Sequence, residues 1–489
     1  MASEKARRPY QATYAVLALA VGGYALLQSL VIPVLPTIQA GLHTSQNTVT
    51  WVLTAYLLSA AIFTPIMGRL GDMYGKERLL VLTLIALTIG SLLAAIASSI
   101  SLMIVARVIQ GVGGGVLPLS FGLIRDEFPK EKVMGAVGVI AALTAAGGGL
   151  GIVLAGPIVD ALNFHWLFWI PMIVLAVVTV AAHLVVPESR VRTPGNLSWP
   201  GIVLLSAWLV ALVLGISEAP TWGWASTSVI GLLIAAAVLC VVWILVESRS
   251  SHPLIDMQMM RIPAVWTTNL VALLLGVGLY AVFAFLPEFL QTPTSAGYGF
   301  GVSITVSGLI LLPMSVFMFA FGMWSGPLSK RFGSKSVLVV GLLVSIVTFL
   351  LLTFAHAAEW QILLAMVIEG VGLGLAFASM SSLVVMAVPP EQTGVASGMN
   401  ANIRTIGGSI GAAVMSSIVT SGVRAGGTPQ ESGYTHGFAL LAVAAVAAAI
   451  AALFVPGKLR SPSVVTEATI PHAELGMVAG GTLVGDESE

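Results

Sequence analysis

Long apolar runs separated by short charged segments are the feature that most limits what this chain can fold into. Fourteen such runs can be counted, at residues 13–36, 48–68, 79–99, 101–124, 133–159, 166–187, 199–217, 227–247, 263–290, 302–326, 336–355, 361–387, 394–421 and 436–456. A helix of about twenty apolar residues crosses the hydrocarbon core of a bilayer. We therefore expect an all-α integral membrane protein with 14 transmembrane helices.

The composition leads to the same class. Hydrophobic residues make up 57% of the chain, charged residues only 9%, and the mean hydropathy is +0.99. Ordinary soluble proteins carry about 25% charged residues, so this chain cannot cover a globular surface that faces water. The formal net charge is zero, which provides no basic surface for nucleic acid.

Lysine and arginine predict the orientation. Cytoplasmic loops of membrane proteins are enriched in these residues. If the N-terminus is cytoplasmic and the runs alternate, 18 of the 21 basic residues fall on the cytoplasmic side. Arg424 falls outside, while Arg107 and Arg404 lie within runs. We expect a multi-pass protein of the cell membrane with both termini in the cytoplasm.

The chain also repeats itself. Residues 108–115, Val-Ile-Gln-Gly-Val-Gly-Gly-Gly, recur at 367–374 as Val-Ile-Glu-Gly-Val-Gly-Leu-Gly, and residues 68–75 have a weaker echo at 326–333. Because both pairs of matching segments are separated by nearly the same number of residues, they indicate a duplication. The predicted units are a six-helix bundle in 1–190, an inserted two-helix pair with linkers in 191–262, a second six-helix bundle in 263–456, and a disordered cytoplasmic tail in 457–489.

A charged segment joins the second and third runs. Residues 68–78 read Gly-Arg-Leu-Gly-Asp-Met-Tyr-Gly-Lys-Glu-Arg. Glycines allow close backbone approach and sharp bends, and Asp72 lies where the next helix begins, a favourable place for an anion. This segment resembles the signature loop of the major facilitator superfamily, Gly-x-Leu-x-Asp-Arg-x-Gly-basic-basic, although Met73 and Glu77 replace basic residues.

The resemblance implies a fold and a role for the loop. Two six-helix bundles would bind substrate between them near the middle of the membrane, and the fourteen-span form with a central pair is similar to the drug:proton antiporter group of the superfamily. It also implies a conformational latch formed by Gly68, Asp72, Gly75, Lys76 and Arg78.

Arg107 is embedded in the fourth run, within Arg-Val-Ile-Gln-Gly at 107–111. A charge in hydrocarbon costs several kcal/mol, so it must face a cavity or a partner. The segment resembles the fourth-span Arg-x-x-Gln-Gly motif of the superfamily, whose arginine is associated with proton transfer. The alternative is a structural donor of hydrogen bonds to neighbouring carbonyls.

Glu369 is the deepest carboxylate of the second half and the repeat partner of Gln110. Desolvation favours the protonated form of a carboxyl group, which suits a group that loads and releases protons. We expect Glu369 in one bundle to face Arg107 and Gln110 of the other across a shared cavity. The alternative is a neutral acid that merely ties helices together.

Two features depart from the antiporter pattern. The fifth run resembles the antiporter motif of the superfamily, but Ile152 replaces proline and Ala155 replaces glycine. The first run carries Gln28 where drug antiporters of this group usually carry Asp. Gln28 can bond a substrate but cannot carry a proton, so coupling must use Glu369, Asp126 or Glu288.

Other side chains are candidates for a substrate cavity. They are polar or large residues inside the runs: Gln28, Gln110, Arg404, Asn400, Phe285 and Met314. Arg404 could instead extend towards the cytoplasmic interface, and the aromatic residues and methionines could face lipid. The sequence has no histidines at metal-ligand spacing and no Lys-Ser/Thr after its glycine motifs, so we expect no cofactor and no metal.

The combined prediction is a transporter. We expect proton-coupled secondary active efflux of hydrophobic or amphipathic small molecules, cationic ones among them, by alternating access. The partners would be the small-molecule substrate, protons and the lipid bilayer, and the protein would be a monomer. A solute importer or uniporter of the same fold is the alternative. An enzyme would need clustered His, Asp and Glu residues or a nucleophile elbow, and the sequence shows neither.

Overall fold

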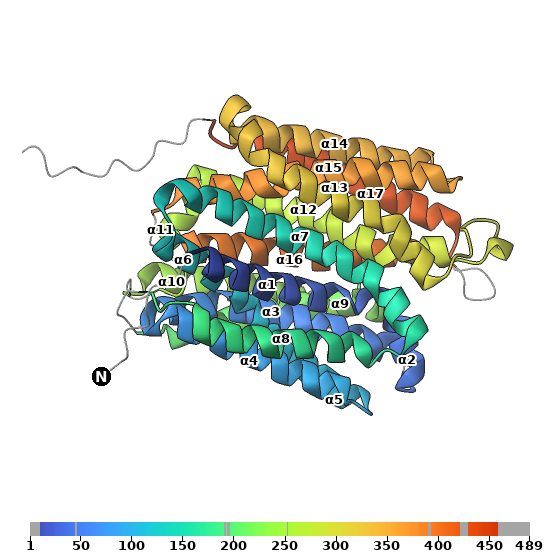
Figure 1. Cartoon of the computed structure of the whole chain (residues 1–489). Coiled ribbons are helices and arrows are strands. Elements are labelled where there is room, and N and C mark those ends of the chain that lie inside the picture. Colours follow the sequence, from blue (N-terminus) through green and yellow to red (C-terminus); the bar gives the residue numbers. More distant parts are fainter. Residues whose placement is uncertain are drawn as a thin grey trace, which may run out of the picture.

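The computed structural model describes residues 10–44, 46–189, 192, 196–251, 253–389, 393–420 and 429–457. Within these ranges every regular element is helical, and the long helices run side by side in one elongated body (Figure 1). In chain order they are α1 (Tyr10–Ser29), η1 (Ile32–Val34), α2 (Leu35–Gly41), α3 (Gln46–Tyr74), α4 (Lys76–Ala95), α5 (Ile100–Gly111), η2 (Val112–Gly115), α6 (Val116–Glu127), α7 (Lys130–Ala161), α8 (Trp166–Val185), α9 (Trp199–Trp222), α10 (Thr227–Arg249), α11 (Met257–Met260), α12 (Pro263–Gln291), η3 (Thr294–Ala296), α13 (Ile304–Phe332), α14 (Ser334–Phe354), α15 (Glu359–Ala387), α16 (Thr393–Thr420) and α17 (Glu431–Leu453).

The expected class, an all-α membrane protein, is confirmed. Within the described ranges, 13 helical segments are long and apolar enough to span a bilayer. The expected run at 394–421 forms α16, a helix of 28 residues, which is not one of the 13. Polar residues such as Asn400, Asn402 and Arg404 make α16 less apolar, although it is long enough to cross.

The buried apolar side chains form two large cores. The first draws its buried residues from Val16 to Val186, along α1 to α8. The second extends from Val271 to Val455, along α12 to α17, and takes in Ile152 of α7. Figure 1 shows the corresponding grouping, with α13, α14, α15 and α17 on one side and α3, α4 and α8 on the other. Each half of the chain therefore packs largely against itself. The tail expected at 457–489 lies, from residue 458 on, outside the described residues.

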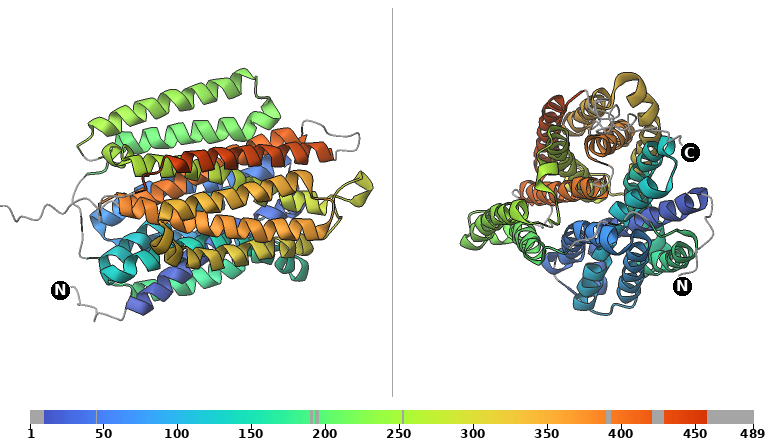
Figure 2. Two further views of the ribbon diagram at one scale, coloured as in Figure 1. Left: turned by 90° about the horizontal axis from the view of Figure 1, so that it is seen from above. Right: turned by 90° about the vertical axis from the view of Figure 1, so that its left-hand side faces the viewer.

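Helices α9 and α10 pack against each other at the edge of the molecule, where Figure 2 shows them in green. Leu205 and Leu209 of α9 join a third apolar cluster with buried residues of α3, α15 and α16. Helix α10 lies outside, and only 17% of its most apolar window is buried. Its exposed Ile234, Val238 and Val241 form an apolar surface suited to lipid.

Small residues bring the two halves into contact along α7 and α13. A Cβ atom on Gly156 would lie 2.6 Å from the Cα atom of Thr305, and one on Gly149 would overlap the Ser315 side chain. Small residues allow this close approach of membrane helices. A second contact places α16 against α3 and α6, where a Cβ atom on Gly398 would lie 3.3 Å from atoms of both Thr64 and Pro118.

A cluster of charges surrounds the connection between α3 and α4, which consists of Gly75 alone with a φ of +119°. Lys76 Nζ lies 3.1 Å from Asp72 Oδ1 and 2.9 Å from Asp126 Oδ2. Arg125 Nε donates to Asp126 Oδ1 over 2.6 Å, and Ser189 Oγ donates to Asp126 Oδ2. The cluster thus joins α3, α4, α6 and the segment that follows α8.

This cluster predicts unequal effects for two neighbouring cations. Lys76 is 3% exposed between two carboxylates, so Lys76→Met should lower the free energy of unfolding by about 3 kcal/mol, because it leaves buried charge uncompensated. Arg78 is 67% exposed and lies 3.7 Å from Glu188, so Arg78→Met should cost about 0–1 kcal/mol. Thermal unfolding of the purified variants, followed by size-exclusion chromatography, measures both effects. Equal losses of unfolding free energy in the two variants would contradict the buried pairing of Lys76 with its two carboxylates.

Candidate functional site

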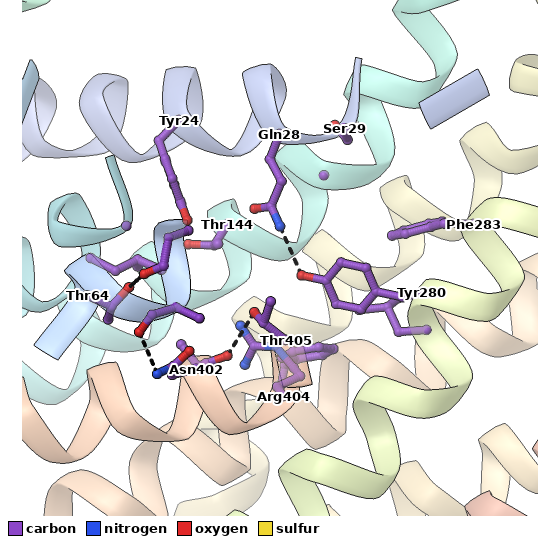
Figure 3. A pocket seen from close by; sticks show the side chains of 18 of the residues that line it. Tyr24, Gln28, Ser29, Thr64, Thr144, Tyr280, Phe283, Asn402, Arg404 and Thr405 are labelled. Atoms are coloured by element: carbon purple, nitrogen blue, oxygen red, sulfur yellow. Dashed lines mark hydrogen bonds between the residues drawn. The ribbon is translucent and has the colours of Figure 1, made fainter. Parts of the chain in front are cut away.

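A small cavity lies between the two bundles. Its volume is about 70 Å³, and its lining comes from α1, α3, α6, α7, α12, α15 and α16, with η1 and η2. Polar and aromatic side chains dominate the part shown in Figure 3, among them Tyr24, Gln28, Tyr280, Asn402 and Arg404. Both halves of the chain therefore contribute side chains to one space.

Two hydrogen bonds beside this cavity join the bundles. Gln28 Nε2 on α1 donates to the hydroxyl of Tyr280 on α12 over 3.0 Å. Asn402 Nδ2 on α16 donates to the carbonyl of Ala61 on α3 over 2.8 Å. Figure 3 marks both with dashed lines. Any separation of the bundles at the cavity must break them.

Arg404 is the charged residue of the cavity. Its guanidinium carbon lies 4.6 Å from the centre of the Phe377 ring. The side chain also lines a second space of about 30 Å³, together with Asn400, whose Nδ2 donates to Asn269 Oδ1 over 2.9 Å. Among the described residues, no Asp or Glu lines either space. The local charge of this site is therefore positive.

Arg107 lies inside the first bundle and does not line the cavity. It is fully buried, its Nε donates to the carbonyl of Val52 over 2.8 Å, and one terminal nitrogen donates to Gln110 Oε1 over 2.7 Å. Gln110 Nε2 in turn donates to Ser91 Oγ on α4 over 3.1 Å. The guanidinium thus bonds a neighbouring carbonyl, as the structural alternative requires.

Two tyrosines separate Arg107 from the cavity. The guanidinium carbon lies 4.2 Å from the centre of the Tyr56 ring, and that ring lies 6.5 Å from the ring of Tyr24. Tyr24 lines the cavity. Arg107 therefore contacts the site through stacked side chains rather than directly.

Glu369 lies inside the second bundle, on α15, and is 1% exposed. Its carboxyl group faces Ser345 and Thr348 of α14, and one of its oxygens has no hydrogen-bond partner among the described residues. Glu369 does not line the cavity. In this conformation Glu369 shares no cavity with Arg107 and Gln110, because each side chain turns into its own bundle, and the roles expected of these residues stay predictions.

The remaining candidates lie in different environments. Asp126 belongs to the charge cluster around Lys76, while Glu288 is exposed at the end of α12 that is remote from that cluster. Met314 is buried in the second core and Phe285 packs against it, so neither lines the cavity. Of the six substrate-cavity candidates, Gln28 and Arg404 line it and Asn400 lines the adjoining space.

Sequence reasoning missed several lining residues. Tyr24, Tyr280 and Phe377 line the cavity, but an aromatic residue in an apolar run has the same pattern whether it faces a core, lipid or a site. Asn402 lies two residues from Arg404 in the sequence. Polar residues at this spacing on an apolar helix were the one signal that pointed to this part of the site.

Comparison with known proteins identifies the family. The profile of the Major Facilitator Superfamily matches residues 17–412 and 268–477. The chain is 30% identical over 414 residues to the tetracenomycin C resistance and export protein of Streptomyces glaucescens, covering 83% of this chain and 76% of that protein.

Two further comparisons support the same family. The chain is 31% identical over 404 residues to a multidrug resistance protein B homolog of Mycobacterium tuberculosis, covering 78% of this chain and 71% of that protein. The crystal structure of the human organic anion transporter MFSD10 has the same fold, with a TM-score of 0.67, 16% identity, and coverage of 91% of this chain and 100% of that one. With its helical bundles and its profile match, this chain belongs to the major facilitator superfamily.

Proposed function

We propose that this protein exports hydrophobic or amphipathic small molecules in exchange for protons, by alternating access between its two bundles. The observation that carries the proposal is the cavity between the bundles, lined by residues of both. Relatives named for antibiotic and multidrug resistance support export. The basic residues favour a cytoplasmic location for the end that carries Lys76 and for both termini.

The contacts between the bundles suit a rigid-body motion. Each bundle has its own apolar core, whereas beside the cavity the bundles are joined by the Gln28–Tyr280 and Asn402–Ala61 bonds. Such bonds contribute about 0.5–1.5 kcal/mol each. The cavity of about 70 Å³ is far smaller than the roughly 300–1,000 Å³ of sites for drug-sized ligands. Substrate entry therefore requires the bundles to move apart.

Glu369 is the carboxylate best placed to carry a proton. Asp126 is already paired with Lys76 and Arg125, and Glu288 is exposed. Glu369 is buried, and no cation lies within ion-pair distance of it among the described residues. A carboxyl group in such a place is stable only as the neutral acid.

Coupling between Glu369 and the cavity would run along α15. Phe377, which lines the cavity, lies eight residues from Glu369 on the same helix, a rise of about 12 Å. Release of the proton requires water at the buried carboxyl group, and therefore a change in how α15 packs on α14. Substrate in the cavity and a proton on Glu369 would then act on one helix, which is the linkage that exchange requires.

Reconstitution tests the proposed function. We expect purified protein in liposomes, with a pH gradient as the only driving force, to accumulate a fluorescent amphipathic compound above its external concentration. A protonophore should abolish the accumulation. A uniporter would bring the compound only to equal concentrations, and that result would contradict proton-coupled export.

Glu369→Gln should uncouple transport. Glutamine resembles the protonated acid in size and hydrogen bonding, so the variant should bind substrate and allow slow downhill movement, while uphill accumulation should vanish. The assay is the liposome experiment above, and Glu359→Gln is the matched control because Glu359 is an exposed acid in the first turn of the same helix. Uphill accumulation by Glu369→Gln would exclude Glu369 as the essential coupling acid.

The contribution of Arg107 to transport should depend on the shape of its side chain as well as on its charge. Two different nitrogens of the guanidinium serve Val52 and Gln110, and lysine lacks this planar fork. We expect Arg107→Lys and Arg107→Ala both to lower the initial transport rate by about tenfold or more, with normal elution profiles of the purified proteins. Full activity of Arg107→Lys would show that the positive charge is sufficient.

The charge cluster is proposed as a latch. It joins α3, α4 and α6 through Asp72, Lys76 and Asp126, and α3 and α6 are the helices that contact α16 around Gly398. Asp72→Asn should therefore slow export while membrane insertion stays normal, and Arg78→Met should leave the rate nearly unchanged. An unimpaired Asp72→Asn variant would exclude the latch role of this residue.

A further inference from the structure

We propose that the central cavity selects organic anions, specifically aromatic compounds that carry a carboxylate. This inference rests on the proposed function, because it takes the cavity as the substrate site. It reverses the expectation that cations are among the substrates. The argument depends on the charge of the cavity, its free hydrogen-bond donors and its aromatic side chains.

The charge of the cavity is the first step. Arg404 is the charged residue in its lining, and no Asp or Glu of the described part of the chain lines the cavity or the adjoining space. Among the described residues no carboxylate lies within ion-pair distance of Arg404. A positive charge within a membrane is costly without a partner, so an incoming anion supplies the missing charge and an incoming cation is repelled.

The comparison with Arg107 shows that Arg404 is not satisfied by the protein. Arg107 bonds the Val52 carbonyl and Gln110. The Arg404 guanidinium lies over the face of Phe377 and within electrostatic range of Tyr280 and Tyr24, but it forms no hydrogen bond or ion pair with a described residue. Its five N–H donors in a planar fork therefore remain for a ligand, and this geometry matches the two oxygens of a carboxylate.

Tyr280 offers a second donor to the same space. Its hydroxyl oxygen accepts from Gln28 Nε2, so its own O–H is left to donate, and it has no acceptor among the described residues. Figure 3 shows Tyr280, Gln28 and Arg404 around one space, although they come from α12, α1 and α16. An anion bound there would receive donors from more than one helix.

Aromatic side chains supply the apolar part of the site. Phe377, Phe283 and Tyr24 line the cavity, and aromatic rings favour stacked or edge-on contact with a ring of the ligand. Together with Arg404, they would line a site for a flat aromatic body that ends in a carboxylate once the bundles move apart.

Three compounds with one ring system and different charges test the proposal. They are anthracene-9-carboxylate, 9-anthracenemethanol and 9-(aminomethyl)anthracene. Binding to the purified full-length protein in an uncharged detergent is measured by equilibrium dialysis with fluorescence detection. We expect the carboxylate to bind about tenfold or more tightly than the alcohol, as a charge-assisted bond provides, and the amine to bind most weakly.

Variants of Arg404 test whether this residue causes the preference for the carboxylate. Arg404→Gln should weaken binding of the carboxylate by about tenfold or more while leaving the alcohol nearly unchanged, which also shows that the variant is folded. Arg404→Lys should be intermediate because it keeps the charge without the fork. Arg331→Gln is the matched control, since Arg331 also stacks on a phenylalanine, Phe332, but lies at the exposed end of α13.

Three outcomes would overturn the inference: the amine binds as tightly as the carboxylate, Arg404→Gln weakens all three compounds equally, or none of them binds. Transport assays with the same compounds separate this inference from the proposed function. Arg404-dependent binding of the carboxylate without uphill accumulation would reject proton-coupled export and keep the anion site. Uphill export with preference for the amine would support proton-coupled export and reject the anion site.

Discussion

The absence of water in the hydrocarbon core is the constraint on which this structure depends. Each polar or charged group inside the membrane must find its partner within the protein. The charged side chains of this chain find their partners in different ways. Asp126 is compensated by Lys76 and Arg125, and Arg107 is bonded by a backbone carbonyl and Gln110. Arg404 is left facing the cavity between the bundles. The embedded charges therefore divide into structural groups and a group available to a ligand.

The duplicated halves meet the same constraint in different ways. Gln110 bonds Ser91 on α4 and Arg107 on its own helix, while its repeat partner Glu369 faces hydroxyl-bearing residues of α14. The two side chains occupy equivalent places, each turned towards the corresponding neighbouring helix. The first half thus holds its guanidinium in an amide–guanidinium network in which Nε and one terminal nitrogen of Arg107 are bonded, while the other terminal nitrogen has no partner among the described residues. The second half carries an acid with one oxygen that lacks a hydrogen-bond partner among the described residues.

The interface between the halves is built for close approach rather than for strength. Gly149 and Gly156 of α7 lie too close to α13 for a Cβ atom, and Gly398 of α16 packs tightly against α3 and α6. Close packing of small residues is the main attraction available to helices in lipid, where apolar surface gains little from association. The bundles therefore meet through closely packed small residues, a few polar bonds and one apolar cluster shared by α3, α15 and α16, while most of the apolar packing lies within each bundle.

The sequence by itself determined the helical membrane class, the twofold duplication and the identity of the embedded charged residues, because hydropathy, repeat spacing and charge in apolar runs are local properties of a chain. Gln28 and Arg404, which the sequence singled out as candidates for a substrate cavity, both line the cavity between the bundles. The direction in which each side chain faces was decided only by the tertiary structure. Arg107, Glu369 and Arg404 all have the same sequence signal, a charge in an apolar helix. Which of them faces a cavity depends on the rotation of each helix against its neighbours, and that rotation follows from packing between segments hundreds of residues apart, as in the contacts of Gln28 with Tyr280 and Asn402 with Ala61.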